Sequence, residues 1–286
     1  MTTLHGLYVP MITPFDASGE VALDALERLA HDILDDGATG LVALGTTAEP
    51  STLTGPERAA VLELLTAVCR DRGAPVIVGA NDAAALRALP EVTAALTLVP
   101  PFLRPGEDGV VAYLTGLAAA SPAPIVLYHV PYRTGQPLSA NAVRRIAAIG
   151  NVIGVKYAAG GIDAATVELM ADLPPGFAVL AGDDMFIAPM LALGAHGAIA
   201  ASAHVATAGY AKLIEAGGAP GHRLALLSAA LFAEPNPTVI KGVLHAQGRI
   251  PTAAVRLPLL PASAGSVGAA LRAGMLDGVA VSSQSS

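Results

Sequence analysis

Short apolar runs alternate along the chain with longer segments in which apolar residues recur at helical spacing. The runs are rich in Val, Ile, Leu and Ala, which is typical of strands buried on both faces of a parallel sheet. They span Leu7–Thr13, Gly40–Leu44, Pro75–Val78, Ala94–Val99, Pro124–His129, Val152–Lys156, Phe177–Ala181 and Gly197–Ala200. This pattern predicts a sheet of eight strands.

The segments between these runs carry apolar residues three and four positions apart, which predicts helices. They are Leu23–Asp36, Thr54–Arg72, Glu107–Ala120, Ser139–Ile149, Ile162–Asp172 and Asp184–Leu193. The second begins on Thr-Gly-Pro-Glu, a capping box with a proline in the first turn. After the third strand, Asp82–Leu89 leaves room for only a short helix.

Eight strands alternating with helices indicate an α/β protein, a closed (β/α)8 TIM barrel, with a doubly wound open sheet as the alternative. From residue 203 onward the pattern is helix after helix. These segments are Ala203–Glu215, Gly221–Phe232, Thr238–Gln247 and Ser266–Ala273. We therefore expect a barrel over 1–202, helices over 203–278 packed on it within the same domain, and a flexible tail over 279–286.

Composition and charge narrow the class of protein. Of the 286 residues 53% are hydrophobic and 14% charged, enough apolar surface for a large core. No uncharged apolar run approaches the ~20 residues of a membrane span, and the N-terminal residues lack a secretory pattern, so we expect a cytoplasmic protein. A net charge of −7 argues against nucleic acid and anionic membranes as partners. Cys69, the single cysteine, excludes an intramolecular disulfide and a cysteine metal cage.

Lysine is rare in this sequence, and one of its three positions is unusual. Lys212 is predicted on a polar helix face, and Lys241 at a helix start is a candidate for a structural ion pair. Lys156 ends a predicted inner strand, at the end of the barrel where (β/α)8 enzymes carry their chemistry. Partial burial there would favour the neutral, nucleophilic amine. The residue types leave two interpretations open: a lysine that attacks carbonyls, or a buried ion pair with Asp183 or Glu49.

Two further groups are expected at the same end of the barrel. Tyr128 closes the strand before that of Lys156, so its phenol could move protons on and off an intermediate. The competing interpretation is a core tyrosine whose hydroxyl is satisfied at the rim. Gly-Thr-Thr-Ala-Glu over 45–49 follows the second strand, and a turn of this kind can bind a carboxylate.

Several ordered motifs carry a resemblance to a known family. They are GTTAE (45–49), YHVPYRTG (128–135), GVK (154–156), AGDD (181–184) and EPNP (234–237). Each is weak alone, but their order and their positions at successive strand ends are specific. Over nearly its whole length the chain resembles the dihydrodipicolinate synthase / N-acetylneuraminate lyase family of class I aldolases.

The resemblance implies a mechanism built on a Schiff base. Lys156 matches the lysine that forms an imine with pyruvate, Tyr128 the phenol of the proton relay, and Thr46 the hydroxyl that extends this relay. The lysine-bound pyruvate becomes an enamine that adds to an aldehyde, with aspartate semialdehyde as a candidate. No metal or organic cofactor is implied, because the imine itself is the electron sink.

The resemblance also implies substrate-binding residues. Thr47 matches the residue that binds the pyruvate carboxylate. Arg133 matches the arginine that grips the distal carboxylate of the second substrate, a role suited to a guanidinium with two parallel donors. Gly182 and Ile199 match positions that line the pyruvate pocket. Members of the family are oligomeric, so a homodimer or homotetramer is expected.

The sequence departs from the family at the relay. Synthases complete it with a tyrosine from a neighbouring subunit, where this chain has Leu103, which cannot pass a proton. A candidate replacement is Tyr132, at a position where synthases usually have a small residue. A water molecule is the other candidate. Tyr157 is expected to point away from the barrel interior because of strand alternation. His129 stands where the family commonly has asparagine.

These departures leave several functions open. The first is a synthase-like addition of pyruvate to an aldehyde bearing a carboxylate. A divergent sugar-acid or 2-oxo-acid aldolase or dehydratase of the same family is the second, and a catalytically impaired 2-oxo-acid-binding homologue the third. A phosphate-binding barrel enzyme is disfavoured, because Asp183 and Asp184 would repel phosphate.

Overall fold

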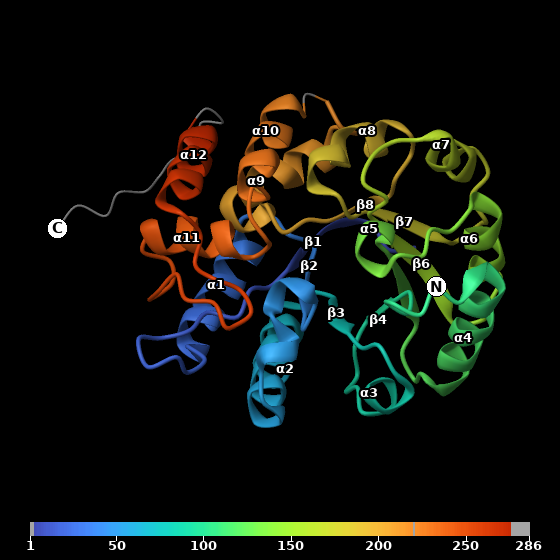
Figure 1. Cartoon of the computed structure of the whole chain (residues 1–286), viewed down its shortest axis with the longest axis horizontal. Helices are drawn as coiled ribbons and strands as arrows, with labels where there is room; N and C mark the ends of the chain where they lie inside the picture. Colours follow the sequence, from blue (N-terminus) through green and yellow to red (C-terminus); the bar gives the residue numbers. More distant parts are fainter. Residues whose placement is uncertain (1–2, 220, 276–286) are drawn as a thin grey trace.

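The computed structural model describes residues 3–219 and 221–275, and its core is a closed barrel of eight parallel strands in chain order (Figure 1). This confirms the predicted (β/α)8 fold over the open sheet. The strands are β1 (Gly6–Pro10), β2 (Gly40–Ala43), β3 (Val76–Gly79), β4 (Ala94–Leu98), β5 (Ile125–His129), β6 (Val152–Tyr157), β7 (Ala178–Ala181) and β8 (Gly197–Ile199). Each lies within one residue of its predicted bounds except β1, which ends at Pro10, three residues before the predicted Thr13.

Helices surround the barrel. Those between strands are α1 (Leu23–Asp35), α2 (Gly55–Arg72), α3 (Ala83–Arg87), α4 (Gly106–Ala120), α5 (Pro131–Thr134), α6 (Ala140–Ala147), α7 (Ala164–Ala171) and α8 (Ile187–Ala192). The capping box of α2 is formed by Thr54 and Glu57, and α3 has only five residues, so both predictions are confirmed.

Two local features differ from the prediction. Helix α5 was not expected, because four residues are too few to show a helical period; Pro131 begins it and Gly135, with a φ of +73°, ends it. The predicted helix over 184–193 divides into the 3-10 turn η3 (Asp184–Phe186) and α8, since Phe186 has a non-helical ψ of 11°. Further 3-10 turns, η1 (Thr46–Ala48) and η2 (Pro50–Thr52), follow β2.

The strands divide the core into an interior and an outer layer, because their side chains alternate between the two faces. The interior cluster consists of Leu4, Tyr8, Val42, Ile77, Ala94, Leu96, Val126, Tyr128, Val130, Ala158, Ala178, Leu180 and Ile199. The outer, larger cluster fills the space between sheet and helices. The polar residues that follow the strands lie at the C-terminal mouth of the barrel, above this apolar interior.

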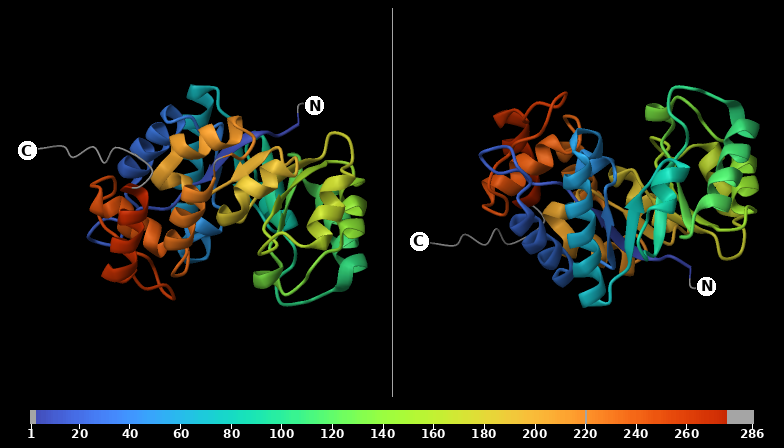
Figure 2. Two further views of the ribbon diagram at one scale, coloured as in Figure 1. Left: turned by 90° about the horizontal axis from the view of Figure 1, so that it is seen from above. Right: turned by 90° about the horizontal axis from the view of Figure 1, so that it is seen from below.

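Helices α9 (Ala203–Glu215), α10 (His222–Leu231), α11 (Thr238–Ala246) and α12 (Ala264–Met275) follow β8. Helix α9 packs on β1, and α11 packs on α9 and α12 (Figure 2). The Thr252 hydroxyl donates a 2.6 Å hydrogen bond to the Phe15 carbonyl, so the C-terminal part reaches the loop after β1. The predicted flexible tail over 279–286 lies outside the described residues. Within the described ranges no helix is long and apolar enough to cross a membrane.

Candidate active site

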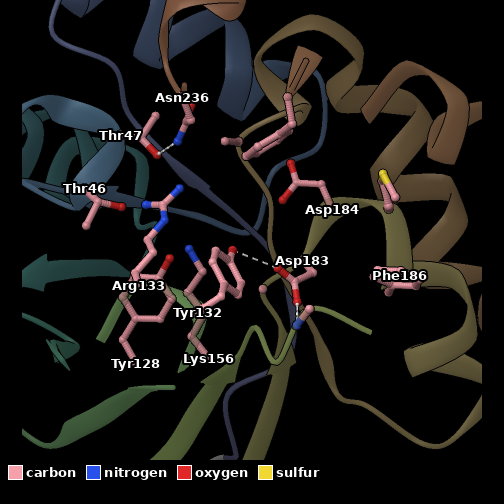
Figure 3. A pocket seen from close by; sticks show the side chains of 15 residues that line it. Thr46, Thr47, Tyr128, Tyr132, Arg133, Lys156, Asp183, Asp184, Phe186 and Asn236 are labelled. Carbon is pink, nitrogen blue, oxygen red and sulfur yellow. Dashed lines mark hydrogen bonds between the residues drawn. The ribbon is translucent and has the colours of Figure 1, made fainter. Parts of the chain in front are cut away.

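Lys156 lies at the C-terminal end of β6 with its side chain inside the barrel, and only 6% of the residue is exposed. Its strand neighbour in register is Tyr128 on β5, and the lysine Nζ lies 4.4 Å from the centre of the Tyr128 ring (Figure 3). The described chain provides no ion-pair partner for this amine. The alternative of an ion pair with Glu49 or Asp183 is wrong, because both carboxylates bind other groups.

Thr46 and Thr47 lie in η1, the turn that follows β2, and both line the pocket above Lys156. The Asn236 Nδ2 donates a 2.9 Å hydrogen bond to the Thr47 Oγ1. Because the Thr47 oxygen accepts this bond, its own proton remains available to an anionic ligand in the pocket. Within the described chain no hydrogen bond joins Tyr128 to Thr46, although both line the pocket.

A buried ion pair anchors the turn that carries both threonines. Lys241 on α11 donates to the Glu49 Oε1 at 2.5 Å, and both side chains are almost fully buried, which confirms the predicted structural role of Lys241. The Arg256 backbone amide donates to the Glu49 Oε2 at 2.9 Å. Burial lowers the pKa of Lys241 to about 8, although the Glu49 carboxylate opposes this shift. The C-terminal helices thus hold the end of η1 in place.

Arg133 lies on α5, the short helix after β5, and its side chain is directed into the pocket. Its guanidinium carbon lies 5.8 Å from the centre of the Tyr132 ring. Figure 3 shows Arg133, Thr46 and Thr47 on one side of the Lys156 amine. This side therefore offers donors to an anionic group.

The opposite wall of the pocket is acidic. Asp183 and Asp184 follow β7. The Asp184 Oδ2 accepts a 2.6 Å hydrogen bond from the Ser202 backbone amide. Burial raises the pKa of the Asp184 carboxyl to about 6, even though this bond and the charge of Lys156 oppose the shift. The pocket thus places two carboxyl groups across from Arg133.

The pocket encloses about 810 Å3, including its open mouth. Besides the residues already described, its lining includes Tyr132, Gly160, Gly182, Met185, Phe186, Ala201 and Phe232. Ile199 is fully buried in the interior cluster and is not part of this lining, so of the seven predicted site residues it alone stands back from the pocket surface. Within residues 3–219 and 221–275 no three His, Cys, Asp or Glu side chains are grouped to hold a metal ion.

Gly182 provides the space that the Lys156 side chain occupies. A Cβ at this position would lie 2.8 Å from the Lys156 Cγ and 3.0 Å from its Cε. We expect Gly182→Ala to displace the amine and to slow imine formation with pyruvate at least about tenfold, since ångström-scale misplacement of a reacting group is costly. The rate of borohydride trapping measures the effect. Gly161→Ala, where an added Cβ meets nothing within 4 Å, is the control; equal trapping rates in the two variants would contradict the prediction.

Of the residues around the predicted proton relay, only Tyr132 lines the pocket, whereas Leu103 and Tyr157 lie outside it. Leu103 is 79% exposed and lies outside the pocket lining, so within this chain it contributes nothing to proton transfer. Tyr157 points away from the barrel interior as predicted: its hydroxyl lies 3.3 Å from the Thr166 Oγ1 of α7. Tyr132 lines the pocket and donates to the Asp183 Oδ1 at 3.1 Å.

His129 faces the outer layer beside Tyr157, with ring centres 5.3 Å apart. Burial lowers its pKa to about 4, against the opposing charge of Asp163. Between pH 6.5 and 4 the unfolded chain therefore binds the extra proton, so this histidine costs stability as the pH falls through that window.

When the pH falls from 7 to 4.5, we expect the unfolding free energy of the wild type to drop by about 2–3 kcal/mol more than that of His129→Asn. Urea unfolding at the two pH values measures this difference. His222→Asn, at an exposed histidine, should leave the pH dependence as it is. An unchanged pH dependence in His129→Asn would refute the assignment.

The motifs led to most of the site but assigned no role to several residues of its lining. Asn236, Asp184 and Phe232 line the pocket without having been assigned a role. The first two belong to motifs that were already visible, EPNP and AGDD. Phe232 ends a helical pattern, and nothing in its local sequence distinguishes it from a core residue.

A buried lysine with no ion pair among the described residues, at the C-terminal mouth of a (β/α)8 barrel and beside a phenol, defines the class of protein: a lyase of the class I aldolase type. Residues 3–269 match the model of the dihydrodipicolinate synthetase family. The chain belongs to this family.

Individual relatives agree. The chain is 37% identical to the 4-hydroxy-tetrahydrodipicolinate synthase of Moorella thermoacetica, over 88% of this chain and 91% of the relative. It is 38% identical to that of Sorangium cellulosum, over 91% of each. Its structure superposes with a TM-score of 0.89, at 30% identity, on the chloride-inhibited dihydrodipicolinate synthase of Acinetobacter baumannii in complex with pyruvate, covering 97% of this chain and all of the other.

Proposed function

We propose that this protein condenses pyruvate with an aldehyde through a Schiff base on Lys156, as a 4-hydroxy-tetrahydrodipicolinate synthase. One observation carries the proposal: the Lys156 amine lies unpaired within the described chain, inside the pocket and 4.4 Å from the Tyr128 ring. The names of the relatives support the choice of reaction. A lysine without a carboxylate partner is free to attack a carbonyl carbon.

The reaction begins when the Lys156 nitrogen attacks the 2-oxo carbon of pyruvate. Tyr128, the neighbour of Lys156 in strand register, protonates the departing oxygen, and water leaves as the imine forms. The protonated imine accepts electrons from the adjacent methyl group, which loses a proton to give the enamine. Thr46 extends the path for these protons toward solvent. The chemistry needs no metal or organic cofactor, because the imine nitrogen takes up the electron pair.

The pyruvate carboxylate binds at Thr47. The amide of Asn236 holds the Thr47 oxygen at 2.9 Å, which leaves the hydroxyl proton for the carboxylate. Gly182 and Ile199 shape the space for the small methyl ketone, with Gly182 at the pocket surface and Ile199 in the layer beneath it.

The charges of the pocket favour an amino-acid aldehyde as second substrate. Arg133 offers a guanidinium to a carboxylate, and Asp183 and Asp184 lie on the opposite wall, where an ammonium group is favoured. Aspartate semialdehyde carries both groups. The enamine carbon attacks its aldehyde carbon, the aldehyde oxygen takes up a proton, and the lysine is released by hydrolysis or by attack of the substrate amine.

A sugar-acid aldolase is the second candidate. The same two aspartates could accept hydrogen bonds from the hydroxyls of a polyhydroxy aldehyde. A neutral sugar would leave Arg133 without an anionic partner, which disfavours this candidate.

The proposal is tested by incubating the protein with pyruvate and borohydride, followed by intact and peptide mass measurement. A reduced pyruvyl adduct on Lys156, together with pyruvate-dependent consumption of aspartate semialdehyde, is the expected result. Absence of an adduct would refute the Schiff base. An adduct with turnover of D-erythrose in preference to aspartate semialdehyde would favour the sugar-acid aldolase.

We propose in addition that the protein is a homodimer or homotetramer. Phe102 and Leu103, in the loop after β4, are 89% and 79% exposed, and such adjacent apolar side chains are suited to a contact with a second copy. Sedimentation equilibrium of the wild type tests this, and a monomer at micromolar concentration would contradict it.

A further inference from the structure

A tyrosine and an aspartate join the loops that follow three successive strands. The Tyr132 hydroxyl, after β5, donates to the Asp183 Oδ1 at 3.1 Å. The Asp183 Oδ2 accepts a 2.6 Å hydrogen bond from the Gly160 backbone amide, after β6. Asp183 itself follows β7. The Asp183 carboxylate therefore connects all three loops at the mouth of the barrel.

This connection passes over the reactive lysine. Strand β6 lies between β5 and β7 in the barrel and carries Lys156 near its C-terminal end. A contact from the loop after β5 to the loop after β7 must therefore cross the end of β6. Figure 3 shows the Tyr132 ring beside the Lys156 amine, with its hydroxyl directed to Asp183.

The Tyr132 ring separates two parts of the pocket. Lys156, Arg133 and the threonines of η1 lie on one side (Figure 3). Asp184 and Phe186 lie on the other side. A short aldehyde held by Arg133 fits on the lysine side, whereas a longer chain would have to pass the ring.

We propose that Tyr132, held across the pocket by Asp183, limits the length of the aldehyde that can react with the enamine on Lys156. The inference rests on the proposed function and narrows its substrate class to short aldehydes with a terminal carboxylate. Tyr132 is then a specificity-determining residue.

The hydrogen bond also bears on the alternative role of Tyr132 in the proton relay. Its phenol proton is directed to Asp183 and not to Tyr128 or the substrate. The Tyr132 residue is 60% exposed, but desolvation at its hydroxyl and the neighbouring Asp183 charge raise its pKa, so the phenol stays neutral. A neutral phenol whose O–H already donates a hydrogen bond to Asp183 is better suited to form a wall of the pocket than to transfer protons.

The test uses a homologous series of carboxylated aldehydes, 4-oxobutanoate and 6-oxohexanoate, each supplied with pyruvate. The readout is the ratio of kcat/KM for the short aldehyde to that for the long one. We expect Tyr132→Ser to lower this ratio at least about tenfold, mainly by accelerating the long aldehyde. Tyr132→Phe keeps the ring but loses the bond to Asp183, and its ratio should lie between those of Tyr132→Ser and the wild type.

Tyr113→Phe is the matched control, since its hydroxyl donates to the Asn81 carbonyl outside the pocket, and its ratio should equal that of the wild type. A ratio in Tyr132→Ser within twofold of the wild type, or no reaction of the long aldehyde in that variant, would overturn the inference. A Tyr132→Phe ratio equal to the wild type would overturn the role of Asp183.

Borohydride trapping with pyruvate is run on every variant to separate the two proposals. A wild-type adduct together with an unchanged ratio overturns only the length limit. Absence of the adduct in the wild type overturns the proposed function and the length limit with it.

Discussion

Lys156→Ala is expected to abolish the pyruvate adduct and to lower kcat for pyruvate-dependent aldehyde consumption by at least about 10^4-fold. The reason is that the covalent imine turns a methyl group into a carbon nucleophile, and no other lysine lines the pocket of the described chain. Lys241 is already bound to Glu49, and Lys212 lies exposed on α9.

Two controls separate loss of chemistry from loss of fold. Lys156→Arg keeps a positive charge beside Tyr128, but its protonated guanidinium cannot form the imine. Its activity should therefore be as low as that of Lys156→Ala. Lys212→Ala should react at the wild-type rate. Because Lys156 has no ion pair in the described chain, its removal leaves no carboxylate unpaired, and urea unfolding should show a small change. Residual turnover of Lys156→Ala above one hundredth of the wild type would contradict the mechanism.

Lys241→Met should be the most destabilising substitution near the site. It would leave the Glu49 carboxylate buried without its cation, which costs about 3–5 kcal/mol of unfolding free energy. It also removes the 2.9 Å bond to the Ala254 carbonyl and the contact of the amine with the Phe15 ring, 4.1 Å from its centre. Denaturant unfolding at pH 7 measures the loss.

The double variant Lys241→Met with Glu49→Gln tests whether the unpaired charge is the cause. We expect it to recover at least about half of the lost stability, because a neutral amide is far less costly to bury than a carboxylate. If Lys241→Met alone costs less than about 1 kcal/mol, the ion pair does not anchor the turn. Lys241→Met should also show a raised KM for pyruvate, because Glu49 ends the turn that carries Thr47.

The sequence determined the architecture because its signals are local. Buried parallel strands are continuous apolar runs, helices show their period, and strand ends point to the mouth of a barrel. Lys156 and Tyr128 could thus be placed at the mouth together, since each closes a strand and the two strands are consecutive. Motif order supplied the family, whose model covers residues 3–269.

Contacts between distant segments were decided only by the tertiary structure. The sequence left open whether Lys156 pairs with Glu49 or Asp183. Packing of α11 instead brought Lys241 to Glu49 from 192 positions away. The bond from Asn236 to Thr47 spans 189 positions, and the bond from Tyr132 to Asp183 spans 51. A local pattern predicts the face on which a side chain lies, but its partner depends on how the loops after separate strands come together. Strand periodicity therefore located the reactive lysine, and loop packing selected the residues that surround it.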